Sequence, residues 1–153
     1  MGRVIKGKVI GPGRASGYGL MNEEPLSFWG GFDYHTGEIT DRRHGLSGEI
    51  AKGRILGLPF SRGSSTTTAV LLEAVRAGTA PAAIITTGID SFFALASIVA
   101  HEMYGKSIPI VAISKDEFAS LHTGDWIEIH DDAHVEIVTE SNISDNFSGE
   151  PTA

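Results

Sequence analysis

Residues 54–78 read RILGLPFSRGSSTTTAVLLEAVRAG, and the change of pattern within them decides the fold. The first five residues form the apolar run of a buried strand, and residues 69–78 have the apolar spacing of a helix that stops at Gly78. Between these two patterns, six of the eight residues from Ser61 to Thr68 carry hydroxyl groups. The stretch therefore predicts a strand, a hydroxyl-rich turn and a helix in succession.

This turn has the composition of an anion-binding site. Ser64, Ser65 or Thr66 can cap the helix, and the unpaired amides of its first turn point toward whatever lies above Gly63. The positive end of the helix dipole favours a carboxylate or a phosphate there, and Arg62 adds a cation that can bind either group. Serines and threonines are also common helix caps, so a purely structural interpretation of the hydroxyl groups stays open.

The composition indicates one acidic globular domain. The chain has 153 residues, of which 41% are hydrophobic, with a net charge of −7 and no cysteine. An acidic chain lacks the basic face that duplex nucleic acid requires, so we expect no nucleic-acid partner. No apolar run approaches the roughly 18 residues of a membrane helix, and the first residues resemble a strand, so we expect a cytoplasmic protein that does not bind membranes. Without cysteine, this chain has no thiol nucleophile, no disulfide and no ligands for an iron–sulfur cluster.

Strand patterns occupy both ends of the chain, and helix patterns occur only in its middle. This order predicts a mixed α/β fold, a β/β/α sandwich with mixed sheets, rather than a doubly wound sheet. The segments expected to form strands are 4–10, 14–18, 26–33, 54–58, 81–87, 108–113 and a closing hairpin over 126–138, and the second helix is expected over 91–104. Residues 1–138 then form the domain, and the polar residues 139–153 form a flexible C-terminal tail.

The serine turn resembles that of the small subunit of aconitase X-type dehydratases. The resemblance includes residues 28–33 (FWGGFD), Thr36-Gly37 and residues 81–85 (PAAII), and it extends over most of residues 3–138. It implies an aconitase-like swivelling domain that closes over a large, cysteine-containing partner subunit. The iron or iron–sulfur cluster of such an enzyme is expected on that partner, and we expect no metal or other cofactor on this chain.

The resemblance also implies which residues act on the substrate. Gly63-Ser64-Ser65 matches the Gly-Ser-Ser turn that provides the proton-abstracting serine in the aconitase superfamily, and this match makes Ser64 the expected catalytic base. Paired glycines at 30 and 31 allow a ligand to approach the backbone closely. The expected substrate-binding residues are Arg62, Gly63, Ser65, Gly30 and Gly31.

The implied reaction is the iron-dependent dehydration of a small hydroxy acid. Two substrates follow from the family, cis-3-hydroxy-L-proline and (R)-5-phosphomevalonate. The low lysine content and modest charge fraction of the chain are not typical of a thermophilic protein, so we favour hydroxyproline.

Two other classes of function remain open. The serine turn could bind phosphate in a module without catalytic activity, or the chain could be a phosphohistidine-type swivelling adaptor. The adaptor would require an exposed histidine, and His44, in the loop expected over 41–48, is the only plausible acceptor. A further histidine pair, His130 and His134, flanks Asp131-Asp132, but turn formation explains these aspartates better than a metal site does.

Overall fold

The structure is a computed structural model that describes residues 3–62 and 65–138, without the side chain of Ser65. Thirteen helices and strands follow one another along these residues. They are β1 (Arg3–Lys6), β2 (Lys8–Gly11), β3 (Ala15–Met21), β4 (Phe32–Asp33), β5 (Glu38–Ile39), β6 (Ile55–Gly57), α1 (Ser65–Ala77), β7 (Ala83–Thr86), α2 (Ser91–Tyr104), β8 (Ile110–Ala112), α3 (Lys115–Ala119), β9 (Trp126–Ile129) and β10 (His134–Val138).

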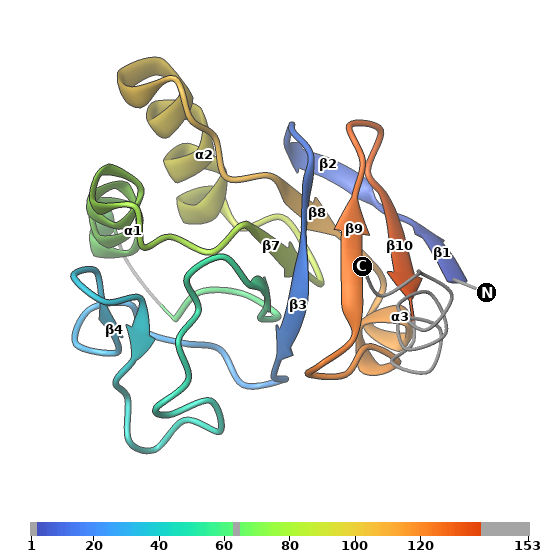
Figure 1. Cartoon of the computed structure of the whole chain (residues 1–153), viewed down its shortest axis with the longest axis horizontal. Helices are drawn as coiled ribbons and strands as arrows, with labels where there is room; N and C mark the ends of the chain where they lie inside the picture. The colour runs from blue at the N-terminus through green and yellow to red at the C-terminus, as the bar shows by residue number, and fades with distance from the viewer. Residues whose placement is uncertain (1–2, 63–64, 139–153) are drawn as a thin grey trace, which may run out of the picture.

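Eight of the strands form one mixed sheet in the order β1-β10-β9-β3-β6-β7-β8-β2. Strands β3, β6, β7 and β8 are parallel neighbours, while the other pairings are antiparallel. The first and last strands of this order, β1 and β2, are consecutive in the chain, so the sheet nearly closes on itself (Figure 1). The predicted α/β class with β/β/α layers and a mixed sheet is confirmed.

Gly7 makes this near-closure possible, and it corrects one expectation. The predicted single strand over 4–10 is wrong, because the chain breaks at Gly7 into β1, which pairs with β10, and β2, which pairs with β8. A Cβ at this position would lie 2.3 Å from Cγ1 of Val111 and 2.9 Å from the carbonyl oxygen of Ala112. Only glycine lets the chain pass this close to β8 while it crosses between the two edges.

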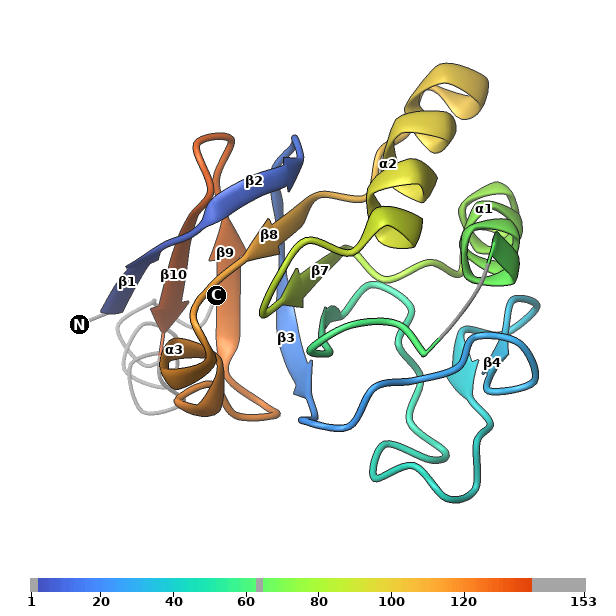
Figure 2. The ribbon, with the colours of Figure 1, turned by 180° about the vertical axis from the view of Figure 1, so that it is seen from behind.

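Alternating side chains of the parallel strands supply two separate cores. On β6, Ile55 faces the interior of the curved sheet, whereas Leu56 packs with the cluster under the helices, and both are fully buried. Helices α1 and α2 lie together on the outer face of the parallel strands, as Figure 2 shows from behind. The parallel strands are therefore buried on both faces, which explains their continuous apolar sequences.

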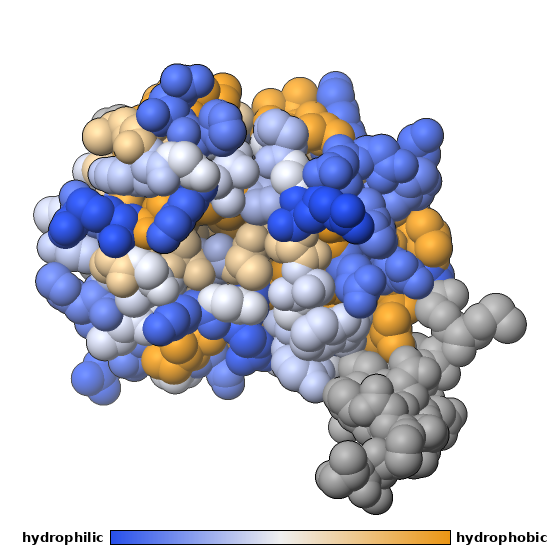
Figure 3. Space-filling view, turned by 45° about the horizontal axis from the view of Figure 1, so that its top comes forward, coloured by the Kyte–Doolittle hydropathy of each residue, from blue (hydrophilic) through white to orange (hydrophobic). Residues whose placement is uncertain are grey.

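The helices agree in part with the sequence. The helix over 91–104 and the closing hairpin are confirmed, with Asp90 as the N-cap of α2 and Gly105 in the left-handed conformation at its end. Helix α3 was not expected, although Ser114 and Glu117 form a capping box at its start. None of the helices in the described residues is long and apolar enough to cross a bilayer. With the upper part of the molecule turned forward, apolar patches alternate with polar ones (Figure 3).

The predicted strand over 26–33 is wrong, and a loop takes its place. Only Phe32–Asp33 pairs regularly, with β5, and Leu26 forms one isolated bridge with Ser61. Phe28 fixes the loop to the core, because its ring is fully buried. The centroid of this ring lies 5.4 Å from that of Phe32 and 5.6 Å from that of Phe93 on α2, which it meets edge to face. The loop is thus held in place by buried aromatic rings rather than by the backbone hydrogen bonds of a strand.

We predict that Phe28→Ala lowers the free energy of unfolding by about 3–5 kcal/mol, because the loop loses its buried anchor and a cavity forms beside α2. Its neighbour Trp29 is 74% exposed, so Trp29→Ala should change stability by no more than about 0.5 kcal/mol. Urea titration of the two variants measures both values. Equal losses at both positions would contradict the placement of the loop.

Candidate functional site

Two strand-to-helix turns meet at the carboxyl ends of β6 and β7. The first leads from β6 to α1 and the second from β7 to α2, so both helices begin at the same edge of the sheet (Figures 1 and 2). Ligands of open α/β sheets bind beyond the carboxyl ends of parallel strands. Ser61 and Thr68, the first and last residues of the hydroxyl-rich turn predicted from the sequence, lie at this edge, where they contact Asp90 and Phe92.

The described residues stop just before the predicted base and resume just after it. Gly63 and Ser64 lie outside the described residues, and Ser65 is described only as the first residue of α1. Arg62 is exposed, and its backbone N–H donates to the carbonyl of Leu26 at 3.0 Å. Its side chain is therefore available to a ligand, while its backbone is fixed to the neighbouring loop.

Asp90 connects the two turns through its carboxylate. Its Oδ2 accepts hydrogen bonds from the backbone N–H of Ser61 at 2.7 Å and from the Ser61 hydroxyl at 2.8 Å. Its Oδ1 accepts from the N–H groups of Phe92 and Phe93, both at 3.0 Å. Ser61 and Asp90 are each only 8% exposed, so these bonds lie away from solvent. Asp90 was not among the residues predicted for the site, although an aspartate directly before the predicted helix at 91 is a signal for an N-cap.

The two helix N-termini differ in charge. Asp90 places a carboxylate at the N-cap of α2, while the first turns of both helices contain no acidic residue. A carboxylate at an N-terminus offsets the positive end of the dipole. The residues of the first turn of α1 provide no such offset.

The paired glycines have a structural role in the loop before β4. Gly30 has a φ of 77°, in the left-handed region, and a Cβ on Gly31 would lie 2.1 Å from the carbonyl oxygen of Ser27. Thr40 donates its side-chain hydroxyl to the Gly30 carbonyl and its backbone N–H to the Gly31 carbonyl. Gly31 is buried, so of the two only Gly30 lies at the surface.

Three large exposed apolar side chains belong to the segments that meet at this edge of the sheet, and we call them the apolar rim. Trp29 is 74% exposed, Phe60 is 52% exposed and Ile89 is 66% exposed. Phe60 and Ile89 directly precede the hydrogen-bonded pair Ser61 and Asp90, and Trp29 belongs to the loop that is bonded to Arg62. Beside Phe60 lies a cavity of about 380 Å³, which is lined by Glu23, Pro25, Pro59, Phe60, Thr87, Lys115 and Phe118.

His44 does not lie at the surface. It is 6% exposed, its Nδ1 accepts the backbone N–H of Leu46 at 3.1 Å, and its Nε2 lies 3.0 Å from the carbonyl oxygen of Glu24. Because Nδ1 is an acceptor here, Nε2 carries the proton and donates to that carbonyl. The expected exposure of His44 is wrong, and the phosphohistidine interpretation loses its acceptor.

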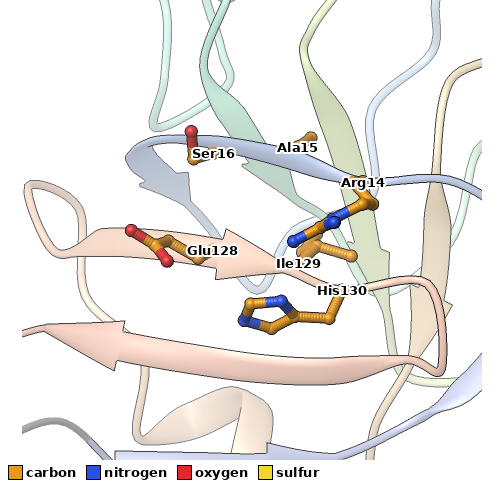
Figure 4. A pocket seen from close by; sticks show the side chains of 6 residues that line it. All are labelled: Arg14, Ala15, Ser16, Glu128, Ile129 and His130. Carbon is orange, nitrogen blue, oxygen red and sulfur yellow. The ribbon is translucent and has the colours of Figure 1, made fainter.

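A second group of polar side chains lies on the antiparallel half of the sheet. Figure 4 shows the hollow of about 330 Å³ between β3 and β9, with Arg14, Glu128 and His130 around it. Among the described residues, Glu128, His130 and Glu136 have ligand atoms within 4.8 Å of one another, although all three are only half-buried. Nε2 of His130 lies 3.3 Å from Glu136, and Nε1 of Trp126 donates to Glu128 at 3.0 Å. Glu128 thus pairs with Trp126, and His130 pairs with Glu136.

The other histidine of this hairpin, His134, lines a neighbouring hollow with His130 and Glu136. His134 Nδ1 bonds to the carboxylate of Asp132, and the backbone N–H of His134 donates to the same side chain. The backbone hydrogen bond is the main cause that lowers the pKa of Asp132 below its usual value. Asp132 therefore stabilises the turn between β9 and β10 through its contacts with His134.

Comparisons with known proteins point to one family. A family model described as "Aconitase X swivel domain" matches residues 4–138. A cis-3-hydroxy-L-proline dehydratase of Pseudomonas aeruginosa is 41% identical over 137 residues, which are 85% of this chain and 23% of the relative. A phosphomevalonate dehydratase small subunit of Methanosarcina acetivorans is 30% identical over 136 residues, 88% of this chain and 90% of the relative. The chain thus spans about a quarter of the first relative's length and nearly all of the second's.

A solved structure supports the same assignment. The crystal structure of Thermococcus kodakaraensis aconitase X matches with a TM-score of 0.79 at 31% identity, over 89% of this chain and 98% of the matched chain. Sequence and fold therefore agree over almost the whole described part of the chain.

Proposed function

The chain belongs to the aconitase X swivel domain family, and from that membership we propose that it is the small subunit of a heteromeric hydro-lyase and supplies its base. The observation that carries this proposal is the hydroxyl-rich turn at the carboxyl end of β6, placed before a helix whose first turn contains no acidic residue. Relatives named as small subunits imply a larger partner. The proposed substrate is a small hydroxy acid, cis-3-hydroxy-L-proline or else (R)-5-phosphomevalonate. The higher identity to the hydroxyproline enzyme supports the first.

The proposed role of this chain is to hold and activate Ser64. A serine hydroxyl is a poor base in water, so its alkoxide character must come from nearby hydrogen-bond donors and positive charge. The amides at the start of α1, the dipole of that helix and the Arg62 guanidinium can provide them. Closure of the domain over the partner would exclude water and strengthen these interactions.

The second half of the reaction would belong to the partner. Cysteine is the usual ligand of iron–sulfur clusters, and this chain contains none, so we place the iron or iron–sulfur centre on the larger subunit. There it would act as a Lewis acid on the departing hydroxyl group. The residues of this chain bind the substrate, remove its proton and keep water out.

Ser64→Ala should lower turnover of the reconstituted complex by about a hundredfold to ten-thousandfold, because loss of a general base costs a rate factor of that order. Subunit assembly, iron content and melting temperature should stay near wild type. Exchange of the substrate's carbon-bound hydrogen with solvent should disappear with turnover. Near-normal activity in Ser64→Ala, with an inactive Ser65→Ala or Ser61→Ala, would move the base to a neighbour.

Arg62→Lys should raise KM and lower kcat, because lysine keeps the charge but lacks the planar fork that binds a carboxylate or phosphate. Arg62→Ala should have a larger effect of the same kind. The exposed Arg3 on β1 provides a matched control, since Arg3→Ala removes the same charge from the other half of the sheet. Unchanged kinetic constants in Arg62→Ala would show that the guanidinium does not bind the substrate.

The apolar rim is the proposed contact with the larger subunit, because a base that acts on the partner's substrate must face that partner. Single substitutions Trp29→Ala, Phe60→Ala and Ile89→Ala should each weaken assembly about tenfold, as loss of an apolar anchor at an interface does. Val4, which is 59% exposed on β1, supplies the control Val4→Ala. Titration calorimetry with the partner measures the Kd. Wild-type affinity in all three rim variants would place the interface elsewhere.

A further inference from the structure

Asp90 has a role that capping of α2 does not explain. Each of its two carboxylate oxygens accepts two hydrogen bonds, one pair from the first turn of α2 and the other from Ser61. An ionised carboxylate has about four acceptor sites in all, so this side chain is saturated. With both oxygens occupied, Asp90 has no free site with which to take a proton from a substrate.

The bonds to Ser61 explain why the residue is an aspartate. Serine, threonine or asparagine would cap a helix about as well, since a cap needs only one acceptor oxygen. Here the second oxygen reaches a residue 29 positions earlier in the chain. An asparagine has only one acceptor oxygen, because its amide nitrogen donates and cannot accept from the N–H and O–H of Ser61. Only a side chain with two acceptor oxygens at this distance can both cap α2 and hold Ser61.

The two sides of the serine turn are both fastened to the start of α2. On one side, Asp90 holds Ser61, and the Arg62 N–H is bonded to Leu26. On the other side, the hydroxyl of Thr68, in the first turn of α1, donates to the carbonyl of Phe92 at 2.9 Å. The chain that enters residues 63 and 64 and the helix that follows them therefore share one support.

From this arrangement we infer that Asp90 is a positioning residue, which fixes Ser61 on the entry side of the turn that carries the proposed base. The inference rests on the proposed function, in which Ser64 is that base. Misplacement of a reacting group by about 1 Å can cost a hundredfold in rate, so loss of this support is expected to appear in kcat. As a positioning residue, Asp90 acts through Ser61 and does not touch the substrate.

The central test compares Asp90→Ser, which keeps a capping oxygen but cannot reach Ser61, with Asp90→Asn, which keeps a single acceptor oxygen. In the reconstituted complex, kcat should fall about tenfold to a hundredfold in Asp90→Ser, with KM within about twofold and the limbs of the pH–kcat profile unmoved. The kcat of Asp90→Asn should lie between the values of Asp90→Ser and the wild type. The control Ser114→Ala removes the N-cap of α3 and should lower the melting temperature without lowering kcat.

Amide hydrogen exchange supplies a readout that does not depend on catalysis. In Asp90→Ser the Ser61 amide should exchange faster, while the amides of Phe92 and Phe93 keep their protection through the new cap. Faster exchange at Ser61 with kcat within twofold of wild type would overturn the inference, because the contact would then be structural only. A shifted limb of the pH profile would also overturn it, since Asp90 would then take part in proton transfer. No turnover in the wild-type complex would reject the proposed function itself, and the positioning role with it.

Discussion

The parallel pairing of β6 with β7 is the constraint on which the site depends. It brings two strand-to-helix turns to one edge of the sheet, so that residues 29 positions apart meet in the bonds between Ser61 and Asp90. The apolar faces of α1 and α2 then cover the outer side of these strands, and the ring of Phe28 attaches the loop before β4 to the same helices. Without this pairing, neither the joint support of the serine turn nor the apolar rim around it would exist.

Electrostatics adds a difference between two helices that look alike in the fold. The start of α2 carries a carboxylate that is fully engaged in hydrogen bonds, while the first turn of α1 has no acidic residue, and the exposed Arg62 precedes it. A net charge of −7 on the whole chain therefore does not prevent local binding of an anion. The composition describes the surface as a whole, and the site depends on a few groups at one edge of the sheet.

The sequence predicted those elements whose signals are local. Helix α2 and the hairpin of β9 and β10 were found from periodicity and turn residues, and the strand and helix on either side of the serine turn were found in the same way. The break at Gly7, the loop before β4 and the burial of His44 depend on contacts with distant segments, which no window of sequence contains. Asp90 lies between these cases, because its cap was visible in the sequence and its bonds to Ser61 were not. Helix α3 was not predicted, although its capping box is a local signal in the sequence.

In the proposed function, this chain provides half of a catalytic site and a larger subunit provides the other half. Turnover by this chain, by its partner and by their mixture can be measured on cis-3-hydroxy-L-proline and on (R)-5-phosphomevalonate side by side. We expect no dehydration by either chain alone, and dehydration of one of the two substrates by the mixture, rising until the chains are equimolar. Full turnover by this chain alone, or no turnover by the iron-loaded mixture on either substrate, would contradict the proposed function.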